Sequence, residues 1–381
     1  MPPIYLRWKR LRVYWMQIKT ITCHDVYNHG ASLQAYVLQT YLESMGHSVE
    51  IIDYKPDYLS GHYRLWTVDN PVFDIPFIKQ LYLLAKLPGR LISLKRKRLF
   101  DEFTNKNLKL TNHRYSSNEE LKENPPQADV FIAGSDQIWN TLFQNGRDPA
   151  FYLDFAPKTS RRISYAASFA TEDVVEGYKP FVQKMLQNFD TISIRERCSL
   201  SLLSSLGRKD GVVVCDPVFL LNRNQWVELL PKGQKVERYL LVYDTERSDK
   251  VKRVAQRIAK AKKLKIYNVS AFRIGYADKE LWASSPLDFV QLIRDAEYVV
   301  SNSFHATAFS IIFERNFCVI NRSEHINERM RSLLMNYMLD DRLVTDYSDS
   351  LLTGINFREV LLSLQKDIDQ SKHYLNEALM G

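Results

Sequence analysis

Several loops of the chain bring together side chains that could bind an anion and transfer protons. These side chains belong to His24, Asp25, Asn28, Ser135, Asp136, Gln137, Arg195, Asn302, Ser303, His305 and Thr307. Histidine and carboxylate groups act as general acids and bases, and an arginine guanidinium binds carboxylates and phosphates through a planar fork. Two predicted helix starts, at Gly30–Ala31 and Ser303–Ala306, add free N–H groups and the positive end of a helix dipole, which attract anions.

A purely structural role is also open for each of these residues. Ser135 and Asp136 can cap a turn. His305 can cap a helix, and Arg195 can form a structural ion pair with Glu196. All these residues lie in loops or helix starts that follow predicted strands, and ligands of open α/β sheets bind beyond the carboxyl ends of the strands. This common position indicates a binding site more strongly than any single residue does. If the two halves of the chain face each other, the loops line one cleft.

Signatures of several other chemistries are missing from the sequence. The chain has no P-loop, no dinucleotide-binding glycine motif, no serine-hydrolase elbow and no zinc-peptidase motif. Its Asp-x-Asp motif, at 367–369, falls within a predicted helix and is interpreted as a solvated face. The four cysteines are scattered, and the eight histidines lack metal-ligand spacing. We therefore expect no metal and no cofactor.

The elements that must position these loops alternate between short apolar strands and amphipathic helices, a pattern typical of parallel α/β sheets. In the first half, strands are predicted over residues 17–22, 48–54, 129–133, 162–166, 191–194 and 211–215. In the second half, strands are predicted over residues 239–243, 265–269, 298–301 and 317–320. The pattern predicts an α/β protein with two doubly wound, Rossmann-like halves that face a cleft.

The predicted organisation has four parts. Residues 1–15 form an extension that we expect to be disordered, residues 16–222 form the first Rossmann-like domain, and residues 223–340 form the second. Residues 55–128 are predicted to be a helical insertion in the first domain. Residues 341–381 contain a long closing helix that we expect to pack back on the first domain.

Composition and charge narrow the classes of protein further. The chain has 381 residues and a formal net charge of +8, which favours anionic partners. No apolar run reaches the ~18 residues of a membrane span, and the basic N-terminus is no secretory signal, so we expect a cytoplasmic protein. The segment 63–100 could lie against the anionic inner leaflet of the membrane, although a core helix followed by a solvated one is favoured. No nucleic-acid recognition motif is present.

Eight sequence blocks resemble the polysaccharide pyruvyl transferase family, in the order that the family has them. They are His24–Ala35, Ile52–Tyr54, Gly134–Asn140, Ser164–Phe169, Ile194–Glu196, Asp216–Pro217, Asn302–Phe309 and Asn327–Arg329. The blocks at 134–140 and 302–309 are the most specific. The resemblance implies two Rossmann-like domains similar to those of B-type glycosyltransferases, with an acceptor-binding N-terminal domain and a donor-binding C-terminal domain.

The resemblance also implies a reaction and a set of site residues. A pyruvyl group would pass from phosphoenolpyruvate to two hydroxyls of one sugar, expected in a lipid-linked polysaccharide precursor, with formation of a cyclic ketal and release of phosphate. The catalytic residues would be His305, Asp25 and Asp136. The donor-binding residues would be Arg195, Ser303, Asn302, Thr307 and Arg329. The acceptor-binding residues would be His24, Asn28, Gly30, Ser135 and Gln137.

One departure from the family concerns the start of the helix in the second domain. Some members carry Arg-x-His there, whereas this chain has Ser303, Phe304 and His305. The candidates for the missing positive charge are Arg195, Arg273, Arg315 and Arg329. Two other functions stay open: a B-type glycosyltransferase that uses a nucleotide sugar, and a non-catalytic binding member of the family, which the loss of the arginine favours.

Overall fold

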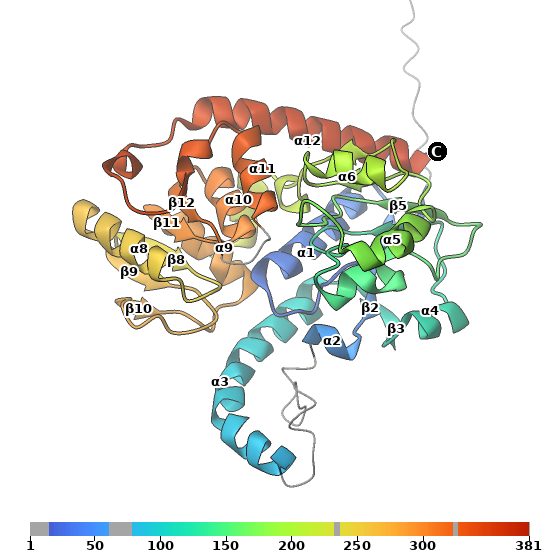
Figure 1. Cartoon of the computed structure of the whole chain (residues 1–381), viewed down its shortest axis with the longest axis horizontal. Coiled ribbons are helices and arrows are strands. Elements are labelled where there is room, and N and C mark those ends of the chain that lie inside the picture. The colour runs from blue at the N-terminus through green and yellow to red at the C-terminus, as the bar shows by residue number, and fades with distance from the viewer. Residues whose placement is uncertain (1–14, 61–77, 232–236, 323–326, 381) are drawn as a thin grey trace, which may run out of the picture.

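Strands and helices alternate through two parallel sheets in the computed structural model, which describes residues 15–60, 78–231, 237–322 and 327–380 (Figure 1). The first sheet has the strand order β3-β2-β1-β4-β5. Its strands are β1 (Gln17–Ile21), β2 (Ser48–Tyr54), β3 (Leu110–Tyr115), β4 (Val130–Ala133) and β5 (Arg161–Ser164). Two short strands, β6 (Ser193–Ile194) and β7 (Val212–Val213), pair with each other. Two isolated β-bridges, Ile163 with Thr191 and Ala167 with Ile194, connect this pair to the β5 edge of the first sheet.

The second sheet has the order β10-β9-β8-β11-β12-β13. Its strands are β8 (Tyr239–Tyr243), β9 (Lys265–Asn268), β10 (Lys279–Glu280), β11 (Tyr298–Ser301), β12 (Asn316–Ile320) and β13 (Leu343–Val344). Both sheets therefore run outward from a central strand in two directions, which is the Rossmann order. The strand order reverses between β1 and β4 in the first sheet and between β8 and β11 in the second. These two switch points are where a doubly wound fold binds its ligands.

Helices connect the strands and cover the sheets. They are α1 (His29–Ser44), α2 (Asp57–Ser60), α3 (Ile78–Asn107), α4 (Asn118–Glu123), α5 (Lys179–Leu186), α6 (Ser199–Ser205), α7 (Arg223–Leu229), α8 (Asp249–Lys262), α9 (Pro286–Asp295), α10 (Phe304–Ile312), α11 (Glu328–Asn336) and α12 (Phe357–Met380). In α8, Ser248 caps the first turn, and Val251, Val254 and Ile258 form the buried stripe of an amphipathic helix. None of the helices in the described residues is long and apolar enough to cross a bilayer.

The two halves meet through buried aromatic and polar contacts. His29, the first residue of α1, stacks on Phe289 of α9 with 4.6 Å between ring centroids. Arg96 of α3 is buried, and its guanidinium donates to the carbonyl oxygens of Tyr27 in the first half and Trp282 in the second. These contacts cross between the halves, so they fix how the two switch points face each other.

The closing helix α12 runs along both halves (Figure 1). On the first half, its Ser371 accepts a hydrogen bond of 2.8 Å from the backbone N–H of Cys215, and the hydroxyl of Tyr374 donates to the carbonyl of Ser164. On the second half, α12 packs against α10, and Val360 and Leu364 are buried in the core that the two halves share. The helix therefore ties the first sheet to the second.

Residues 55–128 differ from the helical insertion that the sequence predicted, because they contain the edge strand β3. The helical prediction was wrong there for a physical reason: the side chains of Asn112, His113 and Arg114 are exposed, so the strand lacks apolar alternation. The other described residues of the region are mostly helical, and the amino end of α3 extends away from both sheets (Figure 1). The extension predicted over residues 1–15 lies outside the described residues except for Trp15, and the apolar face predicted within 63–100 lies outside the described side chains.

Candidate active site

A polar pocket lies where the two switch points face each other. Its lining residues are Asn28, Asp136, Gln137, Thr245, Asn302, Ser303, Phe304, His305, Arg322, Arg329 and Met330. The loops after β1 and β4 contribute from the first half, and the loops after β8 and β11 contribute from the second. These are the two loops that flank the switch point of each sheet. A pocket in this place is the default ligand site of such a fold.

The start of α10 opens into this pocket without a cap. Ser303 stands at the N-cap position, but its side chain makes no capping hydrogen bond. The start of α1 is different, because the Asn28 side chain there accepts from the backbone N–H groups of Gly30 and Ala31. Of the two helix starts singled out from the sequence, only that of α10 therefore keeps its N–H groups for an outside anion.

The His305 ring is held between Gly30 of α1 and Asp216, which follows β7. A Cβ atom placed on Gly30 would lie 1.9 Å from Nδ1 of His305, so only glycine allows the ring this approach. On the other side, Nε2 of His305 lies 3.6 Å from a carboxylate oxygen of Asp216. The ring is 8% exposed. Gly30 and Asp216, both from the first half of the chain, flank it on its two sides.

Asp216 also anchors Arg195, and the pair forms the buried centre of the site. Nη1 of Arg195 donates to Asp216 over 2.5 Å, and Nε donates to Glu196 over 3.1 Å. Burial alone raises the pKa of Asp216, but the charges of His305 and Arg195 outweigh it and hold that pKa well below its usual value. The Arg195 guanidinium lies over the Phe304 ring, 4.5 Å from the centroid, so it contacts α10 from behind the pocket.

Two other arginines face the pocket directly. Arg329 of α11 forms an ion pair with Asp136 over 3.3 Å, and Arg322 donates to Glu246 over 2.7 Å. Burial lowers the pKa of Arg329 to about 10, and the nearby charge of Arg195 adds to this effect. Asp136 has a φ of 76°, in the left-handed region that few non-glycine residues adopt. Such strain concentrates at functional sites.

Asn302 organises the loops of the second sheet. Its side-chain amide donates to a carboxylate oxygen of Asp244 over 2.7 Å, and its oxygen accepts from the backbone N–H and the hydroxyl of Thr245. These bonds join the loop after β11 to the loop after β8. Thr307, predicted to bind the donor, is buried and donates to the carbonyl of Ser303 in its own helix. It does not line the pocket.

The acceptor residues predicted from the sequence separate into two groups. Asn28 and Gln137 line the pocket, and Gly30 touches His305, as described above. His24 belongs to a second, buried charge cluster, and so does Asp25, which the sequence predicted to be catalytic: Nε2 of His24 lies 3.5 Å from Asp53, and Asp25 pairs with Lys55 over 2.6 Å. Neither residue lines the pocket. Burial raises the pKa of Asp53, but the nearby His24 ring and the hydrogen bond from Arg114 outweigh it and hold that pKa at about 2.

Ser135 is also placed away from the pocket surface. Its hydroxyl is fully buried and lies within 3.5 Å of Arg195 and 3.3 Å of Asp216. It supports the buried ion pair and does not line the pocket. Of the four arginines considered for the missing charge, Arg329 alone lines the pocket.

Four lining residues were absent from the predicted site: Thr245, Phe304, Arg322 and Met330. Thr245 carried a usable signal, since it follows β8 at the second switch point, as Asn28 follows β1 at the first. Arg322 follows β12, where an isolated arginine in a loop has no pattern that separates it from the many surface cations. Met330 is an apolar position of a short helix, which predicts only burial.

The two sheets and their facing switch points define the class of fold, which is that of two Rossmann-like halves as in B-type glycosyltransferases. Solved structures of UDP-N-acetylglucosamine 2-epimerase share this fold. The enzyme from Rickettsia bellii is 12% identical over 95% of this chain and 96% of that chain, with a TM-score of 0.52. The enzyme from Neisseria meningitidis, bound to UDP-GlcNAc, is 12% identical over 96% and 100%, with a TM-score of 0.50. At these identities the likeness concerns the fold alone.

The family itself comes from the sequence. The family model of the polysaccharide pyruvyl transferases matches residues 28–324, which is most of the chain. The chain therefore belongs to the polysaccharide pyruvyl transferase family and is a transferase of polysaccharide biosynthesis. The match confirms the resemblance carried by the sequence blocks. No curated protein matches the chain.

Proposed function

We propose that the enzyme binds phosphoenolpyruvate at the start of α10 and transfers its three-carbon unit to two hydroxyls of one sugar. One observation carries the proposal: the uncapped start of α10 opens into a pocket that also holds the guanidinium groups of Arg322 and Arg329. Phosphoenolpyruvate has a phosphate and a carboxylate, and helix N–H groups and guanidinium forks are the groups that bind such anions. We assign to the two arginines the charge that Ser303 does not supply.

The proposed reaction balances without a cofactor. A proton is added to C3 of the enol, so that the methylene becomes a methyl group and C2 becomes electrophilic. One sugar hydroxyl attacks C2 and loses its proton, the bond from C2 to the phosphate oxygen breaks, and the second hydroxyl closes the ketal ring. The two protons that the hydroxyls lose balance the proton gained by C3 and the proton gained by phosphate. The sequence needs one proton donor and one proton acceptor in the pocket.

His305 and Asp136 take these two roles in the proposal. His305 opens the helix at which the donor would bind, and its ring is fixed by Gly30 and Asp216, so it is placed to protonate C3. Asp136 comes from the first half and is placed to accept the hydroxyl protons. Arg329 pairs with Asp136 and lines the same pocket, so it can hold the donor anion beside the acceptor hydroxyls.

The acceptor is proposed to lie against the first half. Asn28 and Gln137 line the pocket from that side and offer amide groups, which donate to and accept from sugar hydroxyls. We propose that this sugar belongs to a lipid-linked precursor and that the enzyme contacts the anionic inner leaflet peripherally. Exposed cations of α8 support that contact; they are Lys250, Lys252, Arg253, Arg257 and Lys260. Co-sedimentation with phosphatidylglycerol vesicles at low salt tests the contact, and absence of binding would remove it.

The proposed reaction is tested by incubation with phosphoenolpyruvate and a panel of free and lipid-linked sugars. The expected product carries the mass of one pyruvate less one water, and phosphate is released in equal amount. His305→Ala should lower kcat more than it changes the KM for phosphoenolpyruvate, because the ring transfers a proton. Glycosyl transfer from a nucleotide sugar, together with thermal stabilisation by that compound and none by phosphoenolpyruvate, would overturn the proposal in favour of a glycosyltransferase.

A further inference from the structure

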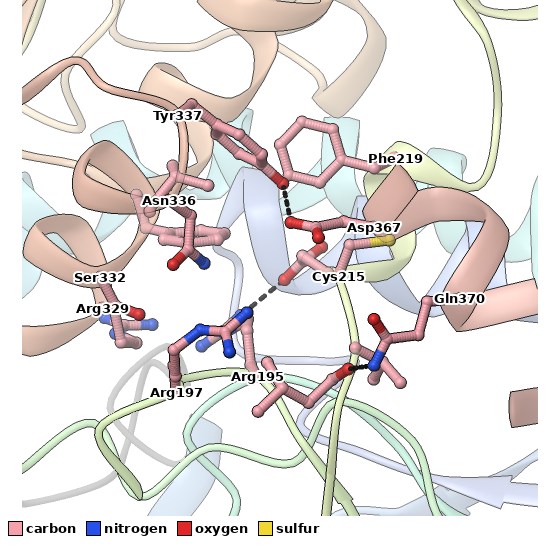
Figure 2. A pocket seen from close by; sticks show the side chains of 15 residues that line it. Arg195, Arg197, Cys215, Phe219, Arg329, Ser332, Asn336, Tyr337, Asp367 and Gln370 are labelled. Atoms are coloured by element: carbon pink, nitrogen blue, oxygen red, sulfur yellow. Dashed lines mark hydrogen bonds and ion pairs between the residues drawn. The ribbon is translucent and has the colours of Figure 1, made fainter. Parts of the chain in front are cut away.

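A second pocket borders the candidate active site, and Figure 2 shows side chains that line it. It lies between the segments that follow β6 and β7, helix α11 and helix α12. Phe304 and Arg329 line both pockets, so they form the partition between them. His305 lines only the first pocket and Arg195 only the second. The second pocket is therefore a separate space that shares a wall with the proposed donor site.

Two buried guanidinium groups in this wall lack partners for some of their N–H groups. The side chain of Arg195 is 3% exposed, and that of Arg329 is 9% exposed. Nη2 of Arg195 and Nε of Arg329 have no hydrogen-bond partner among the described residues. Buried donors in proteins are nearly always paired, and an unpaired donor on a charged group is especially costly. Both arginines line the pocket, so an acceptor placed there could pair with them.

Further donors stand at the same pocket. Arg197 is exposed and has no ion pair with a carboxylate in the described part of the chain. Ser332 and Asn336 of α11 add a hydroxyl and an amide. Figure 2 shows Arg197, Ser332 and Asn336 on the side of the pocket that faces Asp367 and Gln370 of α12.

The carboxylates of the pocket are already occupied. Asp216 is neutralised by Arg195 over 2.5 Å. Asp367 accepts a hydrogen bond of 3.0 Å from the hydroxyl of Tyr337, and burial raises the pKa of Asp367. Asp216 is paired with Arg195, and Asp367 is bound by the Tyr337 hydroxyl and feels the charge of Arg197. Arg197 itself has no ion pair among the described residues, so its guanidinium can also bind an anion. The chemistry of the lining favours a small, compact oxyanion with several acceptor oxygens.

We propose that this second pocket binds inorganic phosphate at a site separate from the donor site. The choice of phosphate rests on the proposed function, which releases it on the other side of the Phe304 partition. Because Arg329 belongs to both pockets, bound phosphate would draw it away from Asp136 and weaken the proposed active site. Phosphate should therefore inhibit turnover from a site that the donor does not occupy, as a product that limits its own formation.

The test is a calorimetric titration of the full chain with inorganic phosphate in the absence of phosphoenolpyruvate. We expect saturable binding that Arg197→Ala weakens about tenfold, the worth of one charge-assisted hydrogen bond. Ser332→Asp, which places a carboxylate in the pocket, should abolish the binding. Arg358→Ala removes an exposed arginine from α12 outside the pocket and is the matched control, with unchanged binding. Arg197 is exposed, so its variant should keep the melting temperature of the unchanged protein.

Two results would overturn the proposal. One is binding of phosphate that neither Arg197→Ala nor Ser332→Asp weakens, because phosphate then occupies another place. The other is the absence of any phosphate binding. Failure of the proposed pyruvyl transfer is a separate result, since no donor is present in the titration and the loss of turnover leaves these affinities unchanged.

Discussion

Gly30→Ala should disable the enzyme by moving a residue on the opposite half of the molecule. The added Cβ would lie 1.9 Å from Nδ1 and 2.2 Å from Cγ of His305, where ordinary contact begins at 3.4 Å. The ring must therefore retreat by about 1.5 Å, or the two helix starts must separate by that distance. A misplacement of about 1 Å in a reacting group can cost ~10²-fold in rate, which corresponds to ~2.7 kcal/mol of lost transition-state stabilisation.

Steady-state kinetics with varied phosphoenolpyruvate measures this effect, alongside urea unfolding. We expect kcat/KM to fall ~10²-fold and the free energy of unfolding to fall by ~1–3 kcal/mol, the usual cost of an overpacked contact. The matched control is Gly177→Ala, because a Cβ at that position meets no atom within 4 Å. It should behave like the unchanged protein.

A double variant shows whether Gly30 acts through His305. If it does, Gly30→Ala combined with His305→Ala should lose no more activity than His305→Ala alone, because both changes affect one ring. Full activity of Gly30→Ala would refute the placement of the ring. Independent, additive losses in the double variant would refute the idea that the glycine serves the histidine.

Three further changes probe the buried charges. Asp216→Asn leaves Arg195 with one carboxylate fewer in the interior and should lower the free energy of unfolding by ~3–5 kcal/mol, measured by urea unfolding at pH 7. The pKa of Asp216 is lower in the folded chain than in the unfolded chain, so the ionised carboxylate stabilises the fold above the unfolded pKa of 3.8. This stabilisation is lost as the pH falls below that value. The free energy of unfolding of Asp216→Asn should therefore change less between pH 5 and pH 3 than that of the unchanged protein. Arg195→Lys keeps the charge but loses the fork, so its melting temperature should lie between those of the unchanged protein and Arg195→Ala; equality with the unchanged protein would contradict the geometry. Burial and the charge of Arg96 hold the pKa of His29 well below 6.5, so stability should fall as the pH drops below that value, and melting temperatures of His29→Phe should show a flatter slope between pH 7 and pH 5.

Much of the fold could be predicted from the sequence because both sheets are built from apolar strands followed by polar loops. The strand predicted over 298–301 coincides with β11, and the predicted stretch 239–243 coincides with β8. Edge strands were less visible. β3 is polar along its middle, and β10 and β13 have two residues each, so none of them leaves a periodic pattern. What holds them is pairing with a neighbouring strand, which is a tertiary contact.

The sequence could predict those site residues that directly follow the carboxyl end of a strand. Asp136 and His305 follow β4 and β11, and the fold brings their loops into one pocket. The same rule also selected Asp25, which pairs with Lys55, because a strand end specifies an edge of the sheet and not the direction in which a side chain turns. The approach of Gly30 to His305 could not be predicted, since it depends on how the two halves pack.

We propose that this pocket converts phosphoenolpyruvate and a sugar diol into a ketal by protonation of the enol. The most direct measurement is turnover in D₂O with mass spectrometry of the pyruvylated sugar and a parallel assay of phosphate. We expect one deuterium in the ketal methyl group, one phosphate released per ketal, and both products formed at a strongly reduced rate with His305→Ala. Release of phosphate without a ketal, or a ketal formed at the normal rate by His305→Ala, would contradict it.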